Sequence, residues 1–429
     1  MPSPTPRPRS LTGWMRSTLS SGAGVAAAMA IMNVGAYGFT IVAARVLGPK
    51  PYGALASLMA TLLVVMVAQL GIQATAARRI AADPDHTSQI ARGVLRVTYR
   101  AAFLFGVVLL ALSPVINAVL HLGSLTTAAL VAAAAVPLTV MGGQAGILQG
   151  ERRWAPLSWI YVASGVPRLL FGAALILWRP TETMAMLGVT LGACVPVLIG
   201  WWALRAERPT HQHSEEHRAR NLLSEALQNS GTLLAFFALS NVDIAVARNV
   251  LDLHDAGLYA AGLILSKAVL FLPQFVVVVS FPAMSTVRER QRALTRGLGL
   301  VAMLGLGSIV GAWLLPGVAL SFVGGVEYAE MGPRLWVFAA LGTALSMLQL
   351  LVYAVLARRG TRSSWLLWVA FAAVVLVGRT ASTPMELAMI VLAADIVVLA
   401  VLFGLSMALI RKPIPVEPDT TALPGHLDA

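Results

Sequence analysis

Apolar stretches separated by short polar segments follow one another along almost the whole chain. Most of these stretches hold about twenty residues or more, enough for a helix to cross a hydrocarbon core about 30 Å thick. The pattern predicts twelve membrane-spanning helices and therefore an all-α integral membrane fold. They are expected near residues 22–47, 51–77, 97–120, 125–149, 157–178, 184–204, 225–250, 257–284, 297–322, 332–357, 363–378 and 385–410.

Composition narrows the class of protein. The chain has 429 residues, of which 58% are hydrophobic and 12% are charged, whereas soluble domains carry about 25% charged residues. This excludes a soluble enzyme. A net charge of +12 would suggest a nucleic-acid partner for a soluble protein, but the basic residues here lie in the short connections. We therefore expect membrane lipids, and no nucleic acid, around the chain.

The basic residues also predict how the helices are oriented. With a cytoplasmic N-terminus, 23 of the 31 Lys and Arg residues lie in inside segments and six at outside ends, as the positive-inside rule requires. Both termini are then cytoplasmic. The apolar run from Gly22 to Ala44 is longer than the core of a signal peptide, so we interpret it as the first membrane helix.

A polar inside connection divides the chain into two halves of six predicted spans. An Ala-Arg pair closes the first span of each half, at Arg45 and Arg248, and a glycine opens the next span, at Gly53 and Gly257. Such a parallel repeat predicts two lobes that flank a central cavity. The predicted parts are a cytoplasmic tail (1–21), a first lobe (22–204), a linker (205–221), a second lobe (222–412) and a disordered cytoplasmic tail (413–429).

Several short motifs resemble one transporter family. They are Arg45-Val-Leu-Gly-Pro with Tyr52-Gly53, Leu70-Gly71-Ile and Arg78-Arg79-Ile-Ala; Asn241-Val-Asp243 with Ala256-Gly257-Leu-Tyr259-Ala; Phe322-Val-Gly324-Gly-Val-Glu327-Tyr328; and Leu356-Ala-Arg358-Arg359-Gly360. In this order they resemble the Wzx-type polysaccharide-export flippases of the multidrug/oligosaccharidyl-lipid/polysaccharide (MOP) superfamily. The chain departs from two relatives: lipid II flippases have fourteen spans, and drug exporters often carry an acidic residue in the first lobe.

The resemblance implies a function and a location. It implies a flippase that moves lipid-linked oligosaccharides from the cytoplasmic to the outer leaflet of the bacterial cytoplasmic (inner) membrane. Its partners would be the lipid-linked sugar and the polymerase or glycosyltransferases of the same pathway. No enzyme activity is expected.

Four ionisable residues fall inside predicted spans, where a charge is costly and is therefore a functional candidate. In one interpretation, Arg168 and Lys267 line the central cavity and bind the phosphate of the carrier lipid. Asp243 and Asp395 would then hold these cations in the empty state, or bind a coupling proton or ion. In the alternative interpretation, the four residues form ion pairs that only fix the packing of the helices.

Arg45 and Arg248 lie at the outer ends of matching spans and are the remaining candidates. They either guide an anionic headgroup out of the cavity or extend to the membrane surface, as arginines at helix ends usually do. No Gly-Lys dipeptide occurs, so no ATPase-type phosphate loop is present. We expect no catalytic residues, cofactor or metal, and a possible coupling proton or Na⁺. The single cysteine, Cys194, is expected to be buried.

Two transport functions fit the sequence. The first is a flippase for a polyprenyl-(pyro)phosphate-linked sugar that works by alternating access. The second is an exporter of small amphipathic molecules coupled to protons or Na⁺, which the excess of intramembrane cations disfavours. A membrane glycosyltransferase is disfavoured because its acidic catalytic groups would need larger loops than this chain has.

Overall fold

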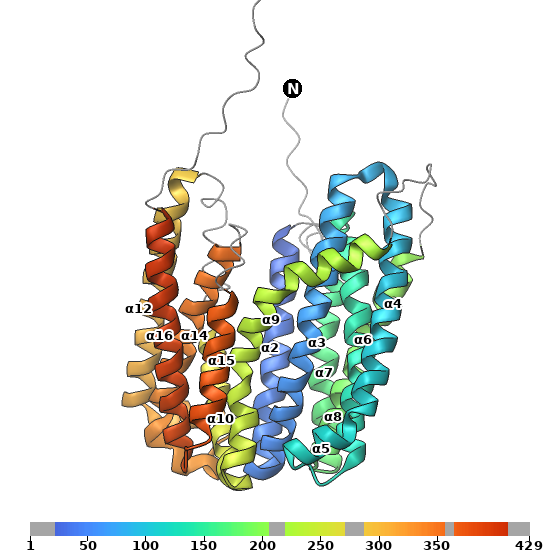
Figure 1. Cartoon of the computed structure of the whole chain (residues 1–429). Coiled ribbons are helices and arrows are strands. Elements are labelled where there is room, and N and C mark those ends of the chain that lie inside the picture. The colour runs from blue at the N-terminus through green and yellow to red at the C-terminus, as the bar shows by residue number, and fades with distance from the viewer. Residues whose placement is uncertain (1–21, 206–218, 271–286, 357–363, 411–429) are drawn as a thin grey trace, which may run out of the picture.

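The computed structural model describes residues 22–205, 219–270, 287–356 and 364–410. Every regular element in these ranges is an α-helix or a 3₁₀ helix, with no strand among them. The long helices lie side by side along a common direction (Figure 1). This confirms the all-α fold expected from the apolar pattern.

The elements follow the order of the predicted spans. Those of the first half are α2 (Gly22–Leu47), α3 (Pro49–Ala82), η1 (Pro84–His86), α4 (Thr87–Ala111), α5 (Ser113–Leu120), α6 (Leu125–Gly150), α7 (Trp154–Trp178) and α8 (Glu182–Leu204). Those of the second half are α9 (Ala219–Val250), α10 (Leu253–Leu270), α12 (Val287–Leu314), α13 (Pro316–Val323), η4 (Val326–Arg334), α14 (Leu335–Leu356), α15 (Ser364–Gly378) and α16 (Pro384–Ile410).

Two predicted spans are wrong as single helices. The span at 97–120 breaks between α4 and α5, and the span at 297–322 breaks between α12 and α13. In both places a proline, Pro114 or Pro316, occupies the start of the short second helix. Proline has no N–H to continue a preceding helix but suits a first turn. The two halves therefore share this break.

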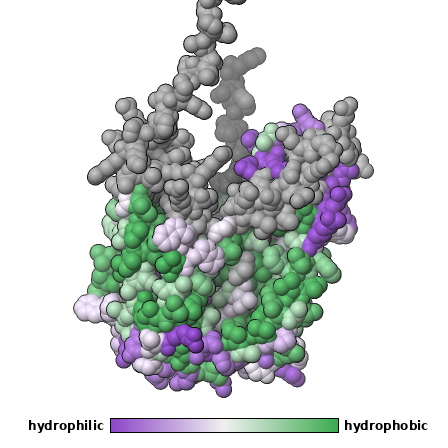
Figure 2. Space-filling view, viewed as in Figure 1, coloured by the Kyte–Doolittle hydropathy of each residue, from purple (hydrophilic) through white to green (hydrophobic). Residues whose placement is uncertain are grey.

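The surface of the bundle is suited to lipid. Nine helices among the described residues are long and apolar enough to cross a membrane, and Trp365–Gly378 is a shorter apolar helix. Figure 2 shows an apolar belt above a hydrophilic lower end. Side chains such as Phe103 (72% exposed) and Leu177 (69% exposed) lie on the outside of the bundle, where a soluble protein would rarely place so many apolar groups. The count of twelve spans stays a prediction.

Some predictions fall on residues outside the described ranges. The two tails (1–21 and 413–429), most of the linker (205–221) and the end of the predicted span at 257–284 belong to this group. The boundaries of the two lobes therefore stay predictions.

A row of glycines on α6 allows it to pack directly against α3. Gly142, Gly146 and Gly150 follow one another at every fourth position, and each faces the backbone or a side chain of α3. A Cβ atom added at Gly146 would lie 2.6 Å from the carbonyl oxygen of Gln73. Small residues at such positions bring membrane helices close together, and here they pack α3 against α6 within the first half.

Replacing Gly146 with alanine is expected to destabilise the protein. The added methyl group must push α3 and α6 apart, and overpacking of this kind costs about 1–3 kcal/mol. The melting temperature of the purified protein in detergent measures the effect. Gly307→Ala is the control, because nothing lies within 4 Å of a Cβ at Gly307 and alanine favours a helix. Equal melting temperatures for the two variants would contradict this account of the packing.

The two halves meet through α3, which contacts both α9 and α10. Near the start of these helices Gly53 faces Gly257, with 3.0 Å between a Cβ built at Gly53 and the Cα of Gly257. A Cβ at Gly257 would in turn meet the carbonyl oxygen of Pro49. The matching glycines of the two halves therefore lie against each other.

Candidate functional site

Arg168 lies on α7 and points toward α2 and α3 without meeting a carboxylate among the described residues. Its Nη2 donates to the sulfur of Met59 at 3.0 Å, and its guanidinium lies 5.3 Å from the centre of the Phe39 ring. The buried Nε has no hydrogen-bond partner in the described part of the chain. A thioether is a weak acceptor, so the cation keeps most of its capacity to bind an anion.

Close helix contacts fix the direction in which Arg168 points. Gly165 on α7 packs against the backbone of Met32 on α2, and Gly192 on α8 packs against the backbone of Arg168. Because α7 is held between two helices by contacts that no larger side chain would allow, it cannot rotate freely. The arginine is therefore aimed toward α3, which faces the second half.

Lys267 lies on α10 in the second half. It forms no hydrogen bond or ion pair with the described residues, but the charges of Asp243 and Arg168 both act on it. The neighbouring Ser266 donates to the carbonyl oxygen of Phe338 at 2.6 Å and is buried, which anchors α10 to α14. The fold thus brings the two predicted cations, one from each half, within electrostatic range of each other.

The two predicted aspartates form a buried group with a tyrosine. The hydroxyl of Tyr259 on α10 donates to Oδ2 of Asp243 on α9 at 2.8 Å. Asp395 on α16 is also buried; the charge of Asp243 acts on it, and its own charge acts on Tyr259. Neither oxygen of Asp395 has a hydrogen-bond partner among the described residues. Because a buried carboxylate without partners is costly, this group is a candidate for binding a proton or a cation.

Sequence reasoning did not identify Tyr259 as a member of this group. The signal was a hydroxyl-bearing aromatic residue inside an apolar helix, eight positions before Lys267. Buried tyrosines usually find a partner for the hydroxyl group, and a neighbouring intramembrane aspartate was the obvious acceptor.

Arg45 and Arg248 lie away from these charges and bind backbone carbonyls instead. Arg45 at the end of α2 is exposed and donates to the carbonyl oxygen of Ser321 on α13. Arg248 at the end of α9 is 3% exposed. Its Nε and Nη2 donate to the carbonyl oxygen of Leu120 on α5, at 2.9 and 2.6 Å, and Nη2 also donates to that of His121 at 2.8 Å. This geometry favours contacts between the halves over guidance of a headgroup.

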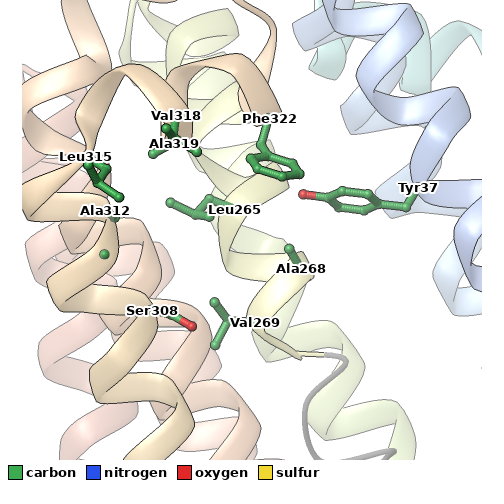
Figure 3. A pocket seen from close by; sticks show the side chains of 11 residues that line it. Tyr37, Leu265, Ala268, Val269, Ser308, Ala312, Leu315, Val318, Ala319 and Phe322 are labelled. Carbon is green, nitrogen blue, oxygen red and sulfur yellow. The ribbon is translucent and has the colours of Figure 1, made fainter.

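An apolar pocket of about 340 Å³ lies between Tyr37 of α2 and the helices α10, α12 and α13 (Figure 3). Tyr37 points from the first half toward Phe322 and Leu265 (Figure 3), and its hydroxyl donates to the carbonyl oxygen of Ile264 at 3.2 Å. Ala268, the residue after Lys267, also lines the pocket, whereas Arg168 and Lys267 do not. The apolar lining of this pocket suits a hydrocarbon chain rather than a phosphate or a sugar.

Cys194 corrects one expectation from the sequence. It is exposed on the outside of α8 rather than buried, and its thiol donates to the carbonyl oxygen of Thr190 at 3.4 Å. An apolar neighbourhood in the sequence does not distinguish a helix face toward lipid from one toward the core.

The fold is similar to those of solved membrane transporters. An inward-facing multidrug resistance transporter of the MATE family, in the MOP superfamily, aligns with a TM-score of 0.67 and 16% identity over 89% of this chain and 94% of that chain. The lipid II flippase MurJ, in an inward closed conformation, aligns with a TM-score of 0.69 and 13% identity over 89% of this chain and 87% of that chain. A MOP superfamily transporter from Pyrococcus furiosus is described as having a binding pocket of reverse polarity. It aligns with a TM-score of 0.62 and 16% identity over 92% of this chain and 97% of that chain.

These similarities and the apolar helices define a multi-pass membrane protein with the fold of MOP superfamily transporters. Residues 20–288 match the family model described as Polysaccharide biosynthesis protein. The chain belongs to this family, which confirms the resemblance drawn from the motifs. No curated protein matches the sequence significantly.

Proposed function

We propose that this protein moves a polyprenyl-(pyro)phosphate-linked oligosaccharide from the cytoplasmic to the outer leaflet of a bacterial cytoplasmic membrane, by alternating access. The observation that carries the proposal is the guanidinium of Arg168, which meets no carboxylate among the described residues and points toward the second half, where its charge acts on Lys267. Like charges repel, so an arrangement that brings them together is favourable when an anion lies between them. A phosphate or pyrophosphate supplies that anion, and guanidinium can bind it through two parallel hydrogen bonds.

The rest of the substrate has suitable surroundings. The pocket, which is lined by Ala268, the residue after Lys267, offers apolar surface to the hydrocarbon chain of a carrier lipid. Asp243 acts on Lys267 and would balance its charge once the substrate has left. The polymerase and glycosyltransferases of the pathway are the proposed partners, because they make and consume such a substrate.

Reconstitution tests the function directly. The purified protein is placed in liposomes that contain a polyprenyl-pyrophosphate sugar with a fluorescent label, and a membrane-impermeant enzyme that cleaves the sugar is added outside. We expect the protein to increase the fraction of substrate that the enzyme reaches. No increase, together with movement of a small cationic dye along a proton or Na⁺ gradient, would contradict the proposal.

That second outcome would favour a proton- or Na⁺-coupled exporter of small molecules. The buried pair Asp243 and Asp395 is the observation that supports this candidate, since carboxylates at membrane depth can bind a coupling proton or cation. The same pair would serve to couple a flippase to an ion gradient, so its presence alone does not choose between the two functions.

The Asp243→Asn variant is expected to lose any dependence of transport on the ion gradient. The amide keeps a hydrogen bond with Tyr259 but has no charge to bind a proton or Na⁺ reversibly. Transport rates at several pH values and Na⁺ concentrations measure the effect in liposomes. Glu327→Gln is the control, because Glu327 is exposed on η4. A gradient dependence equal to that of the wild type would remove Asp243 from the coupling mechanism.

A further inference from the structure

The first helix of each half ends in an arginine that reaches into the other half. Arg45 at the end of α2 donates to the carbonyl oxygen of Ser321 on α13. Arg248 at the end of α9 donates to the carbonyl oxygens of Leu120 and His121, at the end of α5. Because α5 and α13 are the short helices that follow matching breaks, the two contacts are equivalent under the internal repeat.

The acceptors explain why arginine occupies these positions. The last carbonyl groups of a helix have no partner within the helix and carry partial negative charge. Leu120 is the last residue of α5, and His121 adopts a left-handed conformation that ends the helix. A guanidinium can donate to several such oxygens at once. The acceptors are backbone carbonyls, and the carboxylate whose charge acts on Arg248, that of Glu182, is only half-buried, so opening the contact leaves no fully buried anion behind.

Further contacts join the halves at the same end of the molecule. The side chain of Asn249 donates to the carbonyl oxygen of Val119 at 3.0 Å. The buried hydroxyl of Tyr328 on η4 donates to the carbonyl oxygen of Ala44 at 2.9 Å. The contact between Gly53 and Gly257 lies nearby, at the starts of α3 and α10. In Figure 1 this is the lower end of the bundle, where α5 lies, opposite the end at which α2 begins.

We propose that Arg45 and Arg248 form a two-part latch that holds the halves together at the outer side and must release before they can part there. The proposal rests on alternating access as the mode of transport. The two parts differ in strength. Arg248 is buried and makes three donations, whereas Arg45 is exposed and makes one. Release of Arg248 is therefore the more demanding step.

Cysteine labelling at Ala256 tests the latch. Ala256 is fully buried beside Gly53 and Gly257, so a cysteine there reacts with a reagent only when the halves separate. The background is Cys194→Ser with Ala256→Cys, and a membrane-impermeant maleimide is added to the outside of spheroplasts. Labelling is expected to be slow in this background and on the order of tenfold faster when Arg248 becomes glutamine. Arg45→Gln is expected to give a smaller increase, and the double variant the largest.

The design separates the latch from its alternatives. Arg179→Gln is the control, since Arg179 is an exposed arginine whose guanidinium lies over the ring of the adjacent Trp178. Arg248→Lys keeps the charge but loses the planar guanidinium that donates to several oxygens at once. The cysteine at position 256 is therefore expected to label faster in this variant than in the background. This variant provides the test if Arg248→Gln folds poorly. Unchanged labelling in the folded Arg45→Gln and Arg248→Lys variants would overturn the proposal. No substrate is used, so faster labelling would support the latch even if the flipping assay failed.

Discussion

Replacing Arg168 and Lys267 together with glutamine is expected to abolish transport while the protein still inserts and folds. The two cations come from opposite halves, and the charge of Arg168 acts on Lys267. A hydrogen bond to a charged group contributes about 1.5–3 kcal/mol, so losing two weakens binding of a phosphate by roughly a hundredfold or more. Loss of such binding affects both entry of the substrate and its passage between the halves.

Measurement combines the liposome assay with surface polysaccharide on cells that depend on this protein. The control is Arg179→Gln, which removes an exposed arginine at the outer end of α7. Arg168→Lys keeps the charge but loses two-point binding, and is expected to retain partial transport. Full transport by the double variant would show that the pair has a structural role and that the phosphate binds elsewhere.

Replacing Asp395 with valine is expected to stabilise the protein and abolish its coupling to an ion. Both oxygens of this buried carboxylate lack a partner among the described residues, and burial of such a group costs free energy. Replacement of buried charges by apolar residues is often stabilising by about 1–4 kcal/mol. A raised melting temperature with lost ion dependence would identify a residue kept for function at the expense of stability.

The control is an aspartate whose carboxylate does accept hydrogen bonds, so that its removal is expected to lower stability. Asp252 precedes α10, and its Oδ1 accepts hydrogen bonds from the backbone N–H groups of His254 and Asp255 at 2.8 and 2.9 Å. Asp252→Ala removes this cap and is expected to lower stability by about 1 kcal/mol. If Asp395→Val lowered the melting temperature as much as Asp252→Ala, Asp395 would have a structural role instead.

The sequence predicted the helices well because a hydrocarbon core demands long apolar runs. The start of α2 at Gly22 and the end of α8 at Leu204 agree with the predicted spans. The breaks before Pro114 and Pro316 were missed, because hydropathy does not change across them. A proline inside an apolar run either bends a helix or starts a new one, and only the packing of its neighbours decides which.

The site was predictable in its charges but not in its contacts. Arg168 and Lys267 stand out in the sequence because a charge at membrane depth is costly. The partners of Arg168, Met59 and Phe39, look like ordinary core residues. Arg45 was placed correctly at a helix end, but its acceptor is a backbone carbonyl, and every residue has one. Contacts of this kind follow only from the arrangement of the two halves.

The length of α3 has a mechanical consequence. Its 34 residues make a helix about 51 Å long, so that roughly 20 Å projects beyond a hydrocarbon core about 30 Å thick. The side chain of Asp83 accepts from the backbone N–H of His86 at 3.3 Å and closes the turn into α4, and the two helices project together at the upper right of Figure 1. If α3 begins at one edge of the core, its far end lies about 36 Å from the membrane midplane, and a 10° tilt of the first half would move that end by roughly 6 Å.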